Sequence, residues 1–81
     1  MTDQTIEQKV KNFLVRDLNL PDTLERDQPI LTSGLLDSLS VIKIFMLAEV
    51  EFGITLSALD FSQEAFDTVA GISELIQDKI G

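Results

Sequence analysis

The chain has 81 residues, of which 44% are hydrophobic and 25% are charged, and its formal net charge is −8. These values are typical of a small globular domain, and so short a chain has room for only one hydrophobic core. The acidic excess excludes binding to nucleic acid or to anionic membrane surfaces, because both are bound through clusters of Lys and Arg. We therefore expect one domain over residues 1–81, with basic protein surfaces as its partners.

Cysteine and histidine are both absent from the chain. Their absence excludes a disulfide framework, a thiolate metal site and a catalytic Ser-His or Cys-His pair. We therefore expect a protein that is not an enzyme and that holds no metal. The opening stretch MTDQTIEQKV has no apolar run behind a basic leader, and the longest apolar run, residues 44–48, is far too short for a membrane span. We expect a cytoplasmic monomer without a membrane span.

Apolar residues at helical spacing predict a first helix from Thr5 to Leu18. Thr5 and Gln8 fit a capping box at its start, and Asp3 is an alternative N-cap. Five residues form the apolar stripe of this helix: Ile6, Val10, Phe13, Leu14 and Leu18.

The connection over residues 19–37 shows no helical period and contains two prolines and a glycine. Loops of this length are commonly functional or ordered by their own side chains, and a simple tether between antiparallel helices is the alternative. Gly34 is the expected turn residue with a positive φ angle. Four apolar side chains are expected to hold the loop to the core: Leu20, Leu24, Ile30 and Leu31.

A second helix is predicted to begin at Asp37 or Ser38 and to end at Phe52, with Gly53 at the position of a left-handed C-cap. Its apolar residues fall on two stripes. The core stripe consists of Val41, Ile44, Phe45, Ala48 and Phe52. The second stripe consists of Leu39, Ile42, Met46 and Val50. We expect this second stripe to be partly exposed as a docking surface for partners, and the alternative is that the loop over residues 20–36 covers it.

Two more helices are predicted in the C-terminal part of the chain. The first is a helix of about one turn within Phe61–Phe66, capped by Asp60 together with Gln63 or by Ser62 alone. Thr68 is the predicted N-cap of the last helix. The apolar stripe of the last helix consists of Val69, Ile72, Leu75, Ile76 and Ile80.

The predicted fold class is all-α, a small four-helix bundle of three main helices and a short third helix. Gly71 is expected to be an exposed glycine that weakens the last helix slightly. Four phenylalanines at helical spacings are expected in the core: Phe13, Phe45, Phe52 and Phe66.

Ser38 is the residue that the sequence singles out for chemistry, because it lies where a loop becomes a helix. At such a junction, backbone N–H groups without helical partners and the positive end of the helix dipole both favour a bound phosphate. The alternative is an ordinary serine at a helix start, which needs no function. Asp37 fits the N-cap of the same helix.

Residues 34–39, with the sequence Gly-Leu-Leu-Asp-Ser-Leu, together with the later Phe52-Gly53-Ile54, resemble the carrier protein superfamily of acyl, peptidyl and D-alanyl carriers. The resemblance covers nearly the whole chain and implies an acyl-carrier-protein-like fold. It also implies that a phosphopantetheinyl transferase esterifies Ser38 with 4′-phosphopantetheine from coenzyme A. The aspartate matching Asp37 helps to hold the Mg²⁺ of that transferase complex in the family.

Among the carriers, the spacing favours an amino acid as the cargo. Fatty acid carriers usually place one residue between the glycine and the aspartate, whereas two residues separate Gly34 from Asp37, as in D-alanyl and type II peptidyl carriers. The segment Asp60–Thr68 also resembles D-alanyl carriers. Lys43 and Val50 take places that fatty acid carriers fill with acids.

The predicted function is therefore to carry a thioester-bound amino acid, loaded by a separate adenylation enzyme, to downstream biosynthetic enzymes. A fatty acid or polyketide acyl carrier loaded by an acyltransferase is the first alternative. A small acidic helical adaptor, which binds a partner's helix or basic patch without a covalent group, is the second.

Overall fold

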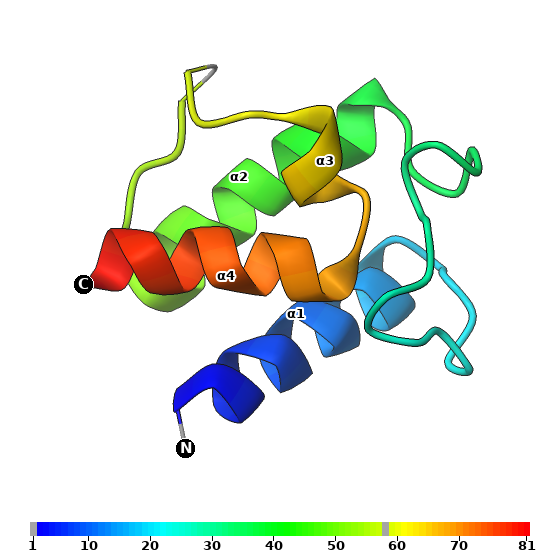
Figure 1. The fold of residues 1–81 in the computed structure, drawn as a ribbon, viewed down its shortest axis with the longest axis horizontal. Coiled ribbons are helices and arrows are strands. Elements are labelled where there is room, and N and C mark those ends of the chain that lie inside the picture. Colours follow the sequence, from blue (N-terminus) through cyan, green and yellow to red (C-terminus); the bar gives the residue numbers. More distant parts are fainter. Residues whose placement is uncertain (1, 58) are drawn as a thin grey trace.

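The computed structural model describes residues 2–57 and 59–81, and the side chains of residues 6–57 and 59–81. This part of the chain forms four helices and no strand, which confirms the predicted all-α bundle (Figure 1). The helices are α1 (Thr2–Asp17), α2 (Ser38–Phe52), the single turn α3 (Gln63–Phe66) and α4 (Val69–Ile80). None of these helices combines the length and the apolar character of a membrane span.

The predicted start of α1 is wrong. The helix already includes Thr2, whereas an N-cap residue has non-helical backbone angles, so neither Asp3 nor Thr5 caps it. At its other end, Asn19 has a φ angle of 61°, and the Leu20 N–H donates to the Leu14 carbonyl oxygen at 3.1 Å. This is the geometry of a left-handed helix stop with asparagine in place of glycine.

The predicted bounds and caps of the other helices are confirmed. Gly53 ends α2 with a φ angle of 67°, and its N–H donates to the Ala48 and Glu49 carbonyl oxygens. Ser62 caps α3 through the Ala65 N–H, and Thr68 caps α4 through the Gly71 N–H. These helix caps depend on side chains and backbone groups within a few residues of one another, so the sequence pattern can predict them.

The core is one cluster centred on Phe66, whose side chain is fully buried. The ring of Phe66 packs edge to face against Phe45, with centroids 5.7 Å apart, and at a tilt against Phe61, at 5.1 Å. Phe13, Phe45 and Phe52 are half-buried against the cluster. The buried apolar side chains of this cluster come from all four helices and from the loops before and after α2: Ile6, Val10, Leu14, Leu20, Leu24, Ile30, Leu36, Ile44, Ala48, Leu56, Phe66, Val69, Ile72 and Ile76.

Two expectations about α4 are wrong. Ile80 is 48% exposed, because the last turn of α4 extends past the core. Gly71 is not an exposed weak point: a Cβ atom there would lie 2.3 Å from the Ala65 carbonyl oxygen, so the glycine is needed for the close crossing of α3 and α4. Figure 1 shows the single turn of α3 lying against α4.

Substitution of Gly71 by Ala tests this crossing. Helix propensity alone predicts that the variant is more stable by about 1 kcal/mol. The clash of the new Cβ atom with the Ala65 carbonyl oxygen predicts that it is less stable by about 1–3 kcal/mol. We expect the loss, measured as the free energy of unfolding in urea. Glu74→Ala, at an exposed position of the same helix, is the control and should change stability by no more than about 0.5 kcal/mol. A stabilised Gly71→Ala variant would contradict the crossing.

Candidate functional site

Ser38 is the first residue of α2, and Asp37, not Ser38, is the N-cap. The Asp37 side chain accepts a hydrogen bond from the Ser40 N–H at 2.9 Å. This bond is the main cause that holds the pKa of Asp37 below its ordinary value, so the carboxylate is charged at neutral pH. Ser38 is exposed, and its hydroxyl makes no hydrogen bond within the described residues. The cap therefore leaves the Ser38 hydroxyl accessible.

The start of α2 favours a bound anion. The first backbone N–H groups of a helix lack helical partners, and the helix dipole places partial positive charge there. The first turn of α2 itself contains no acidic residue, and the carboxylate at this helix start is that of the Asp37 cap. Asp37 uses the Ser40 N–H, and the neighbouring N–H groups at the helix start stay available for a phosphate.

An apolar groove of about 530 Å³ lies beside Ser38. One wall comes from the loop before α2, one from α2 itself and one from the segment before α3. The lining residues are Leu31, Leu36, Asp37, Ser38, Val41, Ile42, Phe45 and Phe61. The sequence pattern pointed to Ser38 but not to this groove, because its walls come from three segments far apart in the chain. The one local signal was the run of leucines on either side of Gly34.

The second stripe of α2 is exposed, as predicted. The exposed fractions are 69% for Leu39, 53% for Ile42, 58% for Met46 and 79% for Val50. The loop over residues 20–36 therefore does not cover the stripe. Most of its own apolar side chains turn inward: Leu20, Leu24 and Ile30 are buried as expected and Leu31 is half-buried, whereas Leu35 is exposed.

Asp67, between α3 and α4, holds this loop in place and was not predicted from the sequence. Its carboxylate accepts the N–H of Leu31 at 3.0 Å, the N–H of Thr32 at 2.9 Å and the hydroxyl of Thr32 at 3.0 Å. Its carbonyl oxygen accepts the Ile30 N–H at 2.7 Å. The backbone N–H of Thr32 is the main cause that lowers the pKa of Asp67. We call this set of bonds the Asp67 clasp.

The loop is also closed on itself next to the clasp. The Leu36 N–H donates to the Ile30 carbonyl oxygen at 2.8 Å, and the Ser33 hydroxyl donates to the Pro29 carbonyl oxygen at 2.8 Å. Gly34 has the expected positive φ angle, 88°. The chain therefore enters Asp37 and Ser38 from a fixed turn.

Sequence comparison agrees with the site. Residues 8–76 match the family model described as phosphopantetheine attachment site. The chain belongs to this family. Its members are carrier domains that hold 4′-phosphopantetheine covalently and are not catalytic, which confirms the predicted carrier superfamily and cofactor. No curated protein matches the chain. Carrier domains of this family are modified by phosphopantetheinyl transferases and interact with biosynthetic enzymes.

The lowered pKa of Asp67 gives the carrier a testable pH dependence. A carboxylate whose pKa is lower in the folded than in the unfolded state stabilises the fold above its unfolded pKa, and this stabilisation disappears as the pH falls through the folded pKa. We expect Asp67→Asn to unfold at lower urea concentration near neutral pH and to lose less stability than the wild type between about pH 5 and pH 3. Urea midpoints at several pH values measure both effects.

Asp78→Asn is the matched control for Asp67→Asn, because it removes one acid at an exposed position of α4. The Asp78→Asn variant should lose as much stability as the wild type when the pH is lowered. If the two variants show the same pH profile, the carboxylate of Asp67 does not act through the clasp.

Proposed function

We propose that this chain is a carrier whose 4′-phosphopantetheine is attached to Ser38. The observation that carries the proposal is the position of Ser38 as an exposed residue at the first position of α2, beside the Asp37 cap. Phosphate ester formation needs a hydroxyl that a separate transferase can reach and a rigid support that presents it. The helix start supplies both, and its backbone N–H groups favour the phosphate that results.

The groove beside Ser38 fits the rest of the group. When attached, 4′-phosphopantetheine supplies a flexible arm that ends in a thiol, on which cargo is held as a thioester. The apolar walls formed by Leu31, Leu36 and Phe61 offer the arm a place to lie next to its attachment point.

Asp37 has a second proposed role in the transferase complex. Its carboxylate is charged at neutral pH and exposed next to Ser38, so it can bind a magnesium ion in that complex. No cluster of three potential metal-ligating side chains occurs within residues 2–57 and 59–81. The transferase and coenzyme A would therefore supply the other ligands of the ion.

We propose an amino acid as the cargo, loaded by a separate adenylation enzyme, with downstream biosynthetic enzymes as acceptors. Two features support this choice over a fatty acyl or polyketide group loaded by an acyltransferase. The first is the pair of residues between Gly34 and Asp37. The second is the exposed face of α2, where Lys43 and Val50 take two of the places that fatty acid carriers fill with acids, so a strongly basic fatty acid synthase surface would find less opposite charge there.

Conversion by a phosphopantetheinyl transferase tests the attachment site. Incubation of the wild-type chain with coenzyme A, Mg²⁺ and a promiscuous transferase should add the mass of one phosphopantetheine, and Ser38→Ala should add none. Ser57→Ala is the control, because it removes an exposed serine outside α2 and should be modified normally. Intact-mass spectrometry reads out all three samples.

A wild-type chain that gains no mass would refute the carrier function and favour the acidic adaptor. A gain that survives Ser38→Ala would place the group on another residue. Once loaded with the arm, the protein is incubated with adenylation enzymes, ATP and amino acids, or with acyltransferases and acyl-coenzyme A. A second mass increase only with the former supports the aminoacyl cargo, and an increase only with the latter contradicts it.

The exposed stripe of α2 is the proposed docking surface for these enzymes. Ile42→Ala and Met46→Ala should each lower kcat/KM of the transferase about tenfold, mainly through KM, because apolar contacts at the centre of an interface each contribute about 1–2 kcal/mol. Since both side chains are exposed, the fold should stay within about 0.5 kcal/mol of wild-type stability.

Leu59→Ala is the control for the docking surface, because Leu59 is an exposed leucine outside α2. Transferase kinetics should be unchanged in this variant. Equal effects of Leu59→Ala and Met46→Ala would mean that exposed apolar area in general, and not the stripe, governs docking.

A further inference from the structure

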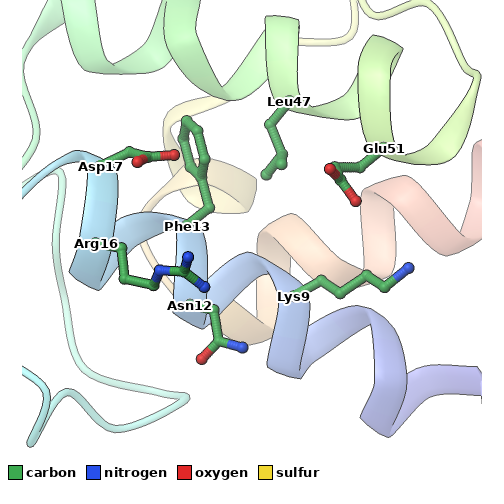
Figure 2. Close-up of a pocket in the computed structure, with 7 residues that line it drawn as sticks. All are labelled: Lys9, Asn12, Phe13, Arg16, Asp17, Leu47 and Glu51. Atoms are coloured by element: carbon green, nitrogen blue, oxygen red, sulfur yellow. The ribbon is translucent and has the colours of Figure 1, made fainter.

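A second groove lies between α1 and α2, and none of its lining residues belongs to the groove beside Ser38. α1 packs mainly along α4, which leaves its other side facing α2 across open space. Figure 2 shows Phe13 of α1 and Leu47 of α2 pointing toward one another across this space, with polar side chains along the edges. We call this feature the α1/α2 groove.

The α1/α2 groove consists of two adjoining hollows of about 250 and 430 Å³ that share Phe13 and Leu47. Phe13 is half-buried and Leu47 is buried, so they form an apolar floor. The larger hollow extends onto the exposed side chains of Met46 and Val50. The groove is therefore continuous with the exposed stripe of α2, but it faces α1.

The charge of this groove differs in sign from that of the rest of the chain. Its edges carry three of the six cationic residues and only two of the fourteen acids. The cations are Lys9, Arg16 and Lys43, and the acids are Asp17 and Glu51. The rest of the chain has three cations against twelve acids. A weakly positive groove thus lies on a strongly negative protein.

The cations along the groove are available to a partner. The ion pairs found within residues 6–57 and 59–81 join Arg26 to Glu7 and Lys79 to Asp60, and none includes a cation of the groove. The Lys9 ammonium lies 5.6 Å from the centre of the Phe52 ring, a cation–π contact that holds it near the groove. Arg16 and Lys43 are exposed.

We propose that the α1/α2 groove binds an amphipathic helix of a partner protein whose apolar stripe is flanked by acidic residues. Lys9 and Arg16 are seven residues apart on α1, so the basic edge is about 10 Å long, or two helical turns. Apolar side chains of the partner helix, spaced at one turn, would contact Phe13, Leu47 and Val50, as in other helix-in-groove complexes. Its acids would lie against Arg16 and Lys43.

A second copy of this chain does not fit the groove as well. Two copies of net charge −8 repel one another. The proposed binding does not use Ser38 or its groove, so it is independent of the attachment of phosphopantetheine.

Two synthetic helical peptides of about 14 residues test the proposal. Both have the same leucine stripe, which is flanked by glutamates in one and by lysines in the other. In NMR titrations of the isotope-labelled full chain, the glutamate peptide should shift resonances of α1 and α2 around the groove. Its Kd should be at least about tenfold lower than that of the lysine peptide, although the net charge of the protein favours the latter.

Charge variants at exposed positions identify the contacts. Arg16→Glu and Lys43→Glu should each weaken binding of the glutamate peptide about tenfold, and Glu51→Gln should tighten it about threefold. Lys11→Glu is the matched control: it makes the same charge change on α1 but does not line the groove, and it should change the Kd by no more than about threefold.

Several results would overturn the proposal. They are tighter or equal binding of the lysine peptide, absence of binding by the glutamate peptide, shifts centred outside the groove, and equal effects of Lys11→Glu and Arg16→Glu. Self-association of the chain through this groove, detected by sedimentation, would also overturn it. Thermal unfolding of each variant shows that the fold is retained.

Discussion

The Asp67 clasp is the interaction on which the position of the site depends. One carboxylate between α3 and α4 accepts hydrogen bonds from three donors of Leu31 and Thr32, and the adjacent carbonyl oxygen accepts the Ile30 N–H. Burial of Leu24 and Ile30 draws the loop to the core, but apolar contacts are not directional and do not fix a backbone. Hydrogen bonds to a charged acceptor do, because they are directional and stronger than neutral ones.

The clasp and the Asp37 cap together determine where Ser38 lies. The clasp fixes the loop on one side, the closed turn at Gly34 brings the chain round, and the cap starts α2 at the next residue. The same arrangement places Leu31 and Phe61 as walls of one groove. Phe61 also packs on the buried ring of Phe66, directly before Asp67, so the core and the site share a support.

Sequence reasoning succeeded where the signal is local. Asp37, Gly53, Ser62 and Thr68 each act on backbone groups within a few residues, and the caps they form were all predicted. Periodicity likewise predicted the exposed stripe of α2 and the burial of Ile44 and Ala48, but it missed Leu47, which is also buried.

The failures involve contacts between distant residues or weak local preferences. The Asp67 clasp joins residues that are 35 or 36 positions apart in the sequence, and no pattern in the loop predicts that its partner is Asp67. The role of Gly71 depends on a crossing with Ala65 that composition cannot show. Asn19 adopts a left-handed conformation that glycine usually adopts. At the other end of α1, no residue pattern in the sequence predicts that the helix begins as early as Thr2.

The net charge of the protein and the charges of single exposed side chains act on a partner at different distances, and both affect which partners bind. At physiological salt the field of the whole protein is screened beyond about 8 Å, so it governs approach more than contact. Contact is governed by the exposed side chains themselves, which on α2 are apolar around Ile42 and Met46, basic at Lys43 and acidic at Glu49 and Glu51. An acidic carrier can therefore attract basic proteins and still select, at contact, partners that bring apolar groups to Ile42 and Met46 and an acidic group to Lys43.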